Sequence, residues 1–282
     1  MAERAVPRLP AQEATPRSGT LAAPGAPTVV FAIPAAVLIG FIILPIVALV
    51  WRGVTTPEFW SSIREPLVLE ALRLTLVTTM GTLLIVVVTG TPLAYLLARG
   101  RFPGRAVLQT VADLPLVLPP MVAGVALLMA FGRRGLLGDQ FALLGIDLPF
   151  TTAAVVLAQV FVAGPFYIRG ATLGFSGVAR EVEEAAAMDG ASFWQGFRLV
   201  TVPLALPGIT GGAVLCLGRA LSEFGATLLF AGNFEGRTQT MSLAILQAMQ
   251  SDLPAALVLA VLLVAVATTV LVLSQALGAR SD

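Results

Sequence analysis

The sequence contains no lysine and no histidine, so all 17 of its basic residues are arginine. A Walker-type nucleotide-binding loop needs a lysine on the phosphates, which excludes ATP hydrolysis by that route. Cys216 is the single cysteine. Without histidine, and with one thiol, the usual zinc, haem and iron–sulfur ligand sets cannot be assembled, and Cys216 is interpreted as a small packing residue. No metal or cofactor is therefore predicted.

Charge is also scarce. Charged residues make up 12% of the chain, against about 25% in soluble domains, and the mean hydropathy is +0.92. The net charge of +1 gives no reason to expect a nucleic-acid partner. These values predict a polytopic membrane protein embedded in a lipid bilayer.

The apolar residues are gathered into runs long enough to cross a bilayer, which takes about 20 residues of helix. We predict an all-α fold with about six transmembrane helices, near residues 28–50, 74–98, 114–131, 151–174, 206–230 and 254–277. Residues 1–27 are rich in Pro, Ala and Arg without an apolar period and are predicted to form a disordered tail. The membrane domain then covers 28–277, and 278–282 form a short C-terminal tail.

Six spans place both termini and the loops near 99–113 and 175–205 on one side. That side carries ten arginines, and the other carries six: Arg52, Arg64, Arg73, Arg133, Arg134 and Arg237. Because cytoplasmic loops are enriched in basic residues, we predict that both termini are cytoplasmic.

The loop at about 178–203 interrupts the apolar pattern with polar residues. Its first part favours a helix with acidic residues in the first turns, where they complement the helix dipole: Glu181, Glu183 and Glu184. Gly190 provides a turn, and Ser192 with Gln195 has the spacing of a capping box for a second short helix. Pro203 and Pro207 are expected to end that helix before the next span. The pattern predicts a cytoplasmic helical hairpin, which we call the hairpin throughout.

Two interpretations of the hairpin follow from these residues. It is either a docking element for a partner, approached closely at the alanines, or an amphipathic connector whose aromatic residues lie at the lipid headgroups. Those aromatic residues are Phe193, Trp194 and Phe197.

A resemblance favours the first interpretation. Glu184-Ala185-Ala186, three residues, Gly190, nine residues and then Val200-Thr201-Val202-Pro203 resembles the EAA motif of ABC-importer permeases, with valine at two positions where that family prefers isoleucine and leucine. The resemblance implies that a separate ATPase subunit docks on Glu184, Ala185, Ala186, Gly190 and Pro203. It also implies a coupling role for the hairpin and no enzymatic activity in this chain.

Two further spans carry candidate residues for a translocation path. Pro119 and Pro120 begin one span, where freed backbone groups must face protein or a cavity. Arg219 and Glu223 lie four residues apart in another, with Ser222 beside them. Charges there cost about 2.5 to 3.5 kcal/mol at the bilayer centre, so they should face the interior or water. A kinked packing helix and a structural ion pair are the alternative interpretations.

The strings "LPLVLPP", "FGRRGLLG", "RALSEFGATLLFAGN" and "GRTQT" resemble the permeases of molybdate importers and also the sulfate/thiosulfate permeases, over roughly residues 70–275. Ser222 stands where that family has glycine. The resemblance implies import of molybdate or tungstate across the cytoplasmic membrane of a bacterium or archaeon. It further implies a homodimer, the ATPase and a periplasmic or extracellular oxyanion-binding protein as partners.

Three alternatives remain open from the sequence. A sulfate/thiosulfate permease differs only in substrate. An ion-coupled secondary transporter would carry internal repeats and intramembrane acids, and Glu223 is the one acid firmly within a predicted span. A membrane scaffold would use the hairpin as a plain interaction site.

Overall fold

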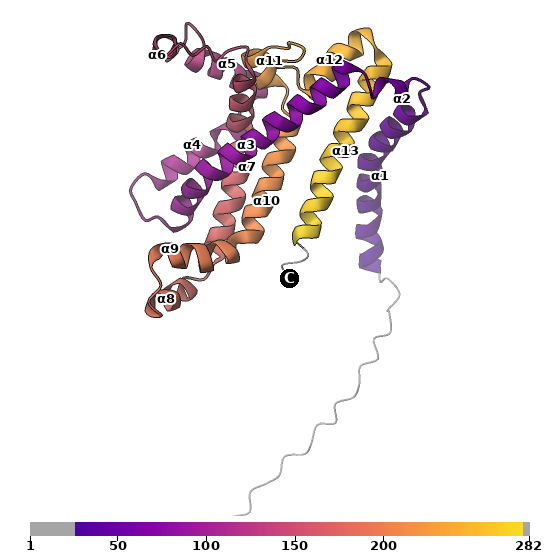
Figure 1. Cartoon of the computed structure of the whole chain (residues 1–282). Coiled ribbons are helices and arrows are strands. Elements are labelled where there is room, and N and C mark those ends of the chain that lie inside the picture. The colour runs from indigo at the N-terminus through magenta and orange to yellow at the C-terminus, as the bar shows by residue number, and fades with distance from the viewer. Residues whose placement is uncertain (1–25, 279–282) are drawn as a thin grey trace, which may run out of the picture. The chain divides into compact units, whose positions relative to one another are not determined.

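The computed structural model describes residues 26–278, which form helices and connecting loops (Figure 1). The all-α prediction is confirmed. The predicted tails, 1–27 and 278–282, lie outside the described residues except for their innermost positions.

Within the described residues, five helices are long and apolar enough to cross a membrane, and a bent helix pair raises the number to six. The long helices are α1 (Ala26–Thr55), α3 (Pro66–Arg99), α7 (Thr152–Gly177), α10 (Val202–Leu221) and α13 (Leu253–Gly278). The short ones are α2 (Phe59–Ser62), α6 (Gly138–Leu143) and α12 (Met241–Ser251). Among the described residues, 26–48 form a unit by themselves, in which the side chains from Val30 onward are exposed, as suits a lipid-facing helix.

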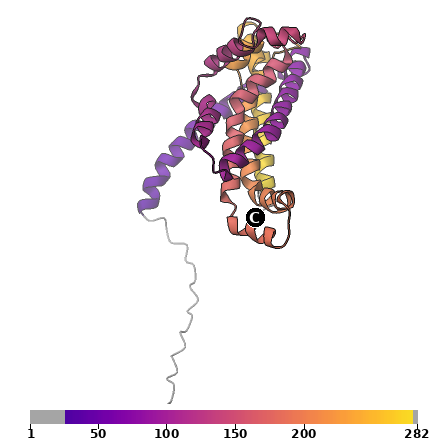
Figure 2. The ribbon, with the colours of Figure 1, turned by 90° about the vertical axis from the view of Figure 1, so that its left-hand side faces the viewer.

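The second unit is a bundle in which α7 packs most extensively against α10 and then against α3 (Figure 2). Glycines allow the closest approach. A Cβ atom added at Gly208 would lie 2.4 Å from the Cα of Gly174, and one added at Gly170 would lie 2.4 Å from the Cα of Gly212. Both helices carry a Gly-x-x-x-Gly spacing, which lets helix backbones touch in a membrane. This contact fixes α7 and α10 as an antiparallel pair.

The predicted span 114–131 is wrong as a single straight helix. The structure has α4 (Arg105–Val117) and α5 (Pro120–Phe131), bent by 118°. A proline forces the residue before it out of the helical region and has no N–H to donate, so Leu118 and Pro119 are both extended, with ψ of 132° and 136°. At 1.5 Å per residue α5 is about 18 Å long, too short to cross a bilayer of about 30 Å by itself.

The predicted span 206–230 also differs from the structure. It begins earlier, because the second hairpin helix runs into α10 without the interruption expected at Pro203 and Pro207. It ends earlier as well, because α10 stops at Leu221 and a separate helix, α11 (Gly225–Ala231), follows a break at 222–224.

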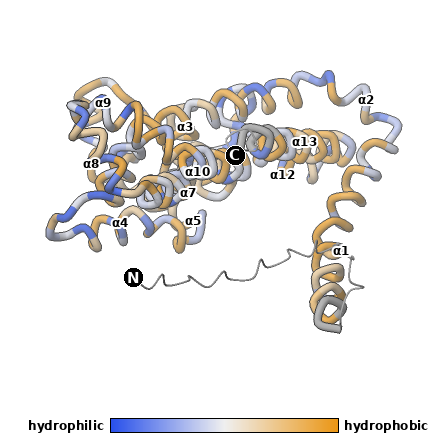
Figure 3. The backbone as a smooth tube through the Cα atoms, turned by 90° about the horizontal axis from the view of Figure 1, so that it is seen from below, coloured by the Kyte–Doolittle hydropathy of each residue, from blue (hydrophilic) through white to orange (hydrophobic). Residues whose placement is uncertain are grey.

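The hairpin end of the bundle is polar. Figure 3, which looks along the bundle from below, shows hydrophilic segments at α8 (Arg180–Met188) and in the loop before α4, whereas α10 and α13 are mostly hydrophobic. The hairpin, the C-terminal end of α3 and the end of α13 lie at this same end of the bundle (Figure 1). The arginines of the 99–113 loop and of the hairpin therefore gather on one side, as the six-span scheme requires.

Candidate functional site

The hairpin begins with α8 (Arg180–Met188) and turns at Gly190, as predicted. Gly190 has a φ of +88°, the left-handed conformation that glycine adopts most easily. The Gly190 N–H donates to the carbonyl of Ala187, and the Ala191 N–H donates to that of Ala186. This pair of bonds is a Schellman motif, which satisfies the last carbonyls of the helix. The turn geometry therefore depends on the glycine.

The second half of the hairpin is α9 (Phe193–Gly196), and its predicted capping box is present. The Ser192 side chain accepts from the Gln195 N–H, and the Gln195 side chain accepts from the Ser192 N–H at 2.8 Å. A π-helical turn, η1 (Phe197–Thr201), then leads directly into α10. The wider turn accommodates Pro203, which lacks an N–H and would crowd the preceding turn of a regular helix.

The residues predicted to dock an ATPase lie on two elements. Glu184 and Ala185 are exposed on α8, Ala186 is half-buried there, and Gly190 is exposed at the turn. Pro203 is also exposed, but it belongs to the start of α10. The hairpin thus presents four of the five residues on a protruding knob with the fifth at its base.

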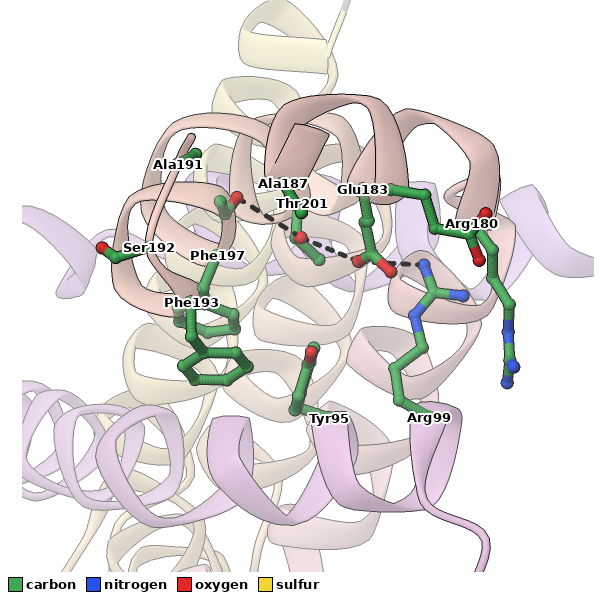
Figure 4. A pocket seen from close by; sticks show the side chains of 12 residues that line it. Tyr95, Arg99, Arg180, Glu183, Ala187, Ala191, Ser192, Phe193, Phe197 and Thr201 are labelled. Carbon is green, nitrogen blue, oxygen red and sulfur yellow. Dashed lines mark hydrogen bonds and ion pairs between the residues drawn. The ribbon is translucent and has the colours of Figure 1, made fainter. Parts of the chain in front are cut away.

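An aromatic cluster joins the inner face of the hairpin to α3 and α7. The Tyr95 ring lies edge-on to Phe175, Phe193 and Phe197, with ring centres 5.4, 6.2 and 5.1 Å away. Figure 4 shows Tyr95 beside Phe193 and Phe197. Trp194 remains exposed. Phe193 and Phe197 therefore contact the ring of Tyr95 on α3. Aromatic residues that only anchored a connector at the lipid headgroups would not need such contacts.

Arg219 and Glu223 form an ion pair at the break after α10. The Arg219 Nη2 lies 2.8 Å from Oε2 of Glu223, whose side chain is fully buried. The other carboxylate oxygen accepts from the Ala226 N–H at 2.8 Å, so Glu223 also caps the start of α11. One buried acid therefore stabilises both sides of the break.

Polar side chains from other helices hold the same break. Gln159 of α7 donates to the carbonyl of Ala220 at 3.2 Å and accepts from the hydroxyl of Thr82 on α3 at 2.9 Å. Ser242 of α12 donates to the carbonyl of Leu221 at 3.3 Å. Buried carbonyls without partners cost about 1 to 3 kcal/mol each, so these bonds stabilise an irregular backbone inside the membrane domain. We call the region from Arg219 to Glu223, with Gln159, the polar joint.

The two helix breaks lie against each other. A Cβ atom added at Gly225 would lie 3.0 Å from the Cβ of Pro120, and one added at Gly124 would lie 2.8 Å from the Cβ of Leu229. The structure thus brings Pro120, from the first break, next to the helix that Glu223 caps.

Arg219 and Ser222 open onto a groove of about 410 Å³ whose other lining residues are apolar or glycine and come from α7, α10 and α13. The Arg219 side chain is 22% exposed. The Ser222 hydroxyl donates to the carbonyl of Arg219 at 3.2 Å, and Ser222 and Pro119 are exposed. A partly exposed guanidinium beside an apolar groove is suited to transient contact with an anion.

An exposed ion pair stabilises the loop between α5 and α7. The Arg133 Nε donates to both carboxylate oxygens of Asp147, at 3.2 and 3.0 Å. Hydrogen bonding to Arg133 holds the pKa of Asp147 below its ordinary value. Because the folded-state pKa is lowered, the pair stabilises the loop above the ordinary aspartate pKa of about 4 and this contribution is lost as the pH falls below it.

Several residues of these sites were not predicted from the sequence. Gln159 is a lone amide in an apolar run. A polar side chain inside a span usually makes a buried hydrogen bond, so the sequence did contain a signal for this residue. Arg99, Glu183 and Thr201 also interact at the base of the hairpin. Their separation along the chain gives no comparable signal.

A bundle of membrane-crossing helices with two helix breaks, an apolar groove that contains one arginine, and a capped hairpin at one end is typical of a multi-pass membrane transport component. The chain belongs to the family of binding-protein-dependent transport system inner membrane components, whose model matches residues 90–281. A component of such an ABC transporter works with an ATPase and a binding protein.

Similar proteins are of the same kind. The "Molybdenum transport system permease protein ModB" of Mycobacterium bovis is 43% identical over 255 residues, which cover 88% of this chain and 93% of that protein. The "Sulfate transport system permease protein CysT" of Escherichia coli is 34% identical over 242 residues, 85% of this chain and 87% of that one.

A crystal structure of a bacterial ABC transporter that imports the acidic polysaccharide alginate contains a chain of the same fold. The TM-score is 0.70 at 17% identity, with 89% of this chain and 95% of that chain covered. At this identity the likeness concerns the fold alone.

Proposed function

We propose that this chain is the permease subunit of a molybdate importer in the cytoplasmic membrane and that it moves the oxyanion inward, driven by a separate ATPase. The observation that carries the substrate is the 43% identity to a molybdenum permease along 93% of that protein's length. Sulfate or thiosulfate is the second candidate, because the sulfate permease also matches over 85% of this chain, at 34% identity. Tungstate, which shares the charge and shape of molybdate, is expected to compete.

The hairpin is the ATPase-docking element in this proposal. Its helices, turn and cap form a knob that projects from the end of the bundle (Figure 1). The chain has no lysine for a nucleotide-binding loop of its own. With the hairpin on the cytoplasmic side, both termini are cytoplasmic and the α5–α7 loop faces the oxyanion-binding protein outside.

The translocation path in this proposal runs past the polar joint. Arg219 meets the oxyanion while Glu223 keeps the guanidinium in place and limits how tightly the anion is held, with Ser222 and the Pro119–Pro120 break alongside. The groove beside Arg219 lies at the side of one bundle. Two copies of the chain facing each other across that groove would enclose a path, which supports a homodimer.

Uptake into liposomes tests the proposal. The chain is reconstituted with its ATPase and binding protein, and ATP-dependent entry of labelled molybdate is measured with tungstate and sulfate as competitors. Inhibition by tungstate but not by sulfate is the expected result. Uptake of sulfate without uptake of molybdate would transfer the assignment to the second candidate, and uptake that needs an ion gradient but not ATP would reject the class.

The first test of docking is Glu184→Lys. This change reverses the charge of an exposed hairpin residue, and a like charge placed at a docked surface costs several kcal/mol. We expect the chain to insert normally and to lose most of the ATPase that copurifies with it. Asp139→Lys is the matched control, since Asp139 is an exposed acid in α6 at the opposite end of the bundle. Equal ATPase recovery with both variants would contradict the docking role.

The second test concerns the hairpin turn, through Gly190→Val. No atom lies within 4 Å of a Cβ added at Gly190, so the effect arises from the backbone alone. The left-handed conformation costs an L-residue about 1 to 2 kcal/mol, and more for a β-branched one. We expect Gly190→Val to lower molybdate uptake strongly, while Gly190→Asn, which tolerates this conformation, retains most of it. Similar uptake by the two variants would show that the turn does not need this conformation.

A further inference from the structure

A second set of contacts, distinct from the exposed docking face, ties the base of the hairpin to α3 (Figure 4). Arg99 is the last residue of α3, and its Nη2 donates to the carbonyl of Val178, just after α7, at 2.7 Å. The same nitrogen lies 3.2 Å from Oε1 of Glu183 in α8. That oxygen also accepts from the hydroxyl of Thr201, at the entry to α10, at 2.8 Å. We call Arg99, Glu183 and Thr201 the clasp.

The clasp lines a pocket of about 510 Å³ between α3 and the hairpin, and its side chains are largely but not fully buried (Figure 4). The Arg99 and Glu183 side chains are 13% and 23% exposed, and Thr201 is buried. Charge-assisted hydrogen bonds in such surroundings are stronger than at an open surface, and removal of one partner leaves the other charge uncompensated. Glu183 is adjacent to Glu184 in the sequence, but Glu184 is exposed. Glu183 and Glu184 therefore differ in burial, although both line this pocket.

The covalent structure explains why a clasp is needed. The hairpin is joined through the backbone to α7 and α10, whereas α3 reaches it through non-covalent contacts. Tyr95, one turn before Arg99, contributes aromatic contacts to Phe193 and Phe197. Edge-to-face ring contacts hold the two surfaces together, whereas charge-assisted hydrogen bonds are also strongly directional. A displacement of α8 is thus passed to α3 at Arg99 and to α10 at Thr201 through one carboxylate.

Further along, α3 contacts the parts of the molecule that surround the proposed path. Thr82 of α3 donates to Gln159, which holds the carbonyl of Ala220 at the polar joint. Thr75 of α3 accepts from the N–H of Met241 at the start of α12 at 2.8 Å. A movement of α3 relative to α7 therefore acts directly on the hydrogen bonds at the helix break.

We propose that the clasp is the link through which movement of the docked hairpin reaches α3, so that Arg99, Glu183 and Thr201 are positioning residues for transport. This inference rests on the proposed function, in which an ATPase moves the hairpin. Glu183 acts inside the subunit and Glu184 at its surface. Loss of the clasp then uncouples ATP hydrolysis from transport without releasing the ATPase.

The test compares ATP hydrolysis and molybdate uptake in the reconstituted complex for Arg99→Ala, Glu183→Gln and the double variant. Glu181→Gln is the matched control, since Glu181 is an exposed acid on the same helix. We expect the ATPase to stay bound and active, and the molybdate moved per ATP to fall by about tenfold in each single variant. The double variant should be no worse than either single one. Thr201→Val, which removes only the hydroxyl, should lower the ratio in the same direction by a smaller factor.

The outcomes are separable from failure of the proposed function. A wild-type complex that moves no molybdate rejects the proposed substrate. The amount of sulfate moved per ATP is then measured in the same variants. A wild-type complex that transports, with unchanged ratios in the clasp variants, overturns the clasp. Loss of the ATPase from Glu183→Gln would place Glu183 at the docking surface and also overturn it. The clasp would also be rejected if Glu181→Gln lowered the molybdate moved per ATP as much as Glu183→Gln does, or if the losses of the single variants added up in the double variant.

Discussion

Gly208→Ala is expected to destabilise the membrane domain by about 3 kcal/mol, at the upper end of the cost of overpacking. The new methyl group would lie 2.4 Å from the Cα and 2.6 Å from the N of Gly174, which are backbone atoms that no rotamer change can move aside. The two helices must separate, and α7 with α10 forms the most extensive helix contact in the bundle. The measurement is the monodisperse fraction of detergent-solubilised protein after mild heating.

Gly211→Ala provides the matched control for Gly208→Ala. Gly211 lies three residues along the same helix, and no atom outside its own helix lies within 4 Å of its added Cβ. Alanine is favoured over glycine in a helix by up to about 1 kcal/mol, so this variant should be as stable as wild type or more so. If both variants behave alike, backbone contact between α7 and α10 is not what holds the pair together.

The hairpin was predictable because its signals are local. A glycine at the turn and a serine three residues before a glutamine act within one or two helical turns, and Gly190, Ser192 and Gln195 adopt the predicted conformations. The continuation through Pro203 was not predicted. A π-helical turn that accommodates a proline depends on packing around it, in this case burial of Thr201 beneath α8.

The helix breaks show a different limit. The Pro119–Pro120 break was encoded locally, but an apolar run of sufficient length outweighed it in the prediction of a single span. The break at 222–224 contains neither proline nor an unusual run of polar residues. It exists because Gln159, Ser242 and the Glu223 carboxylate satisfy backbone groups that a continuous helix would have paired. Glu223 lies within the break, but Gln159 and Ser242 come from distant positions and cannot be recognised from spacing within one segment.

Arg219→Ala is expected to cost about 3 to 5 kcal/mol of stability, the range for breaking a buried ion pair by removing one partner. The Glu223 carboxylate is fully buried and loses the guanidinium 2.8 Å away. Its other oxygen still accepts from the Ala226 N–H, so the side chain cannot leave without also uncapping α11. The expected result is a large loss of folded protein after solubilisation and a loss of molybdate uptake.

The double variant Arg219→Ala/Glu223→Gln shows whether uptake is lost because the protein is destabilised or because Arg219 contacts the oxyanion. Glutamine keeps an acceptor for the Ala226 N–H but carries no charge, so the double variant should recover most of the stability that Arg219→Ala loses, and the two changes should be strongly non-additive. If Arg219 contacts the oxyanion, uptake stays low in this stable variant. If uptake returns together with stability, the pair is a structural element of the break and the path does not use it. Additive losses would instead show that the two residues do not act as a pair.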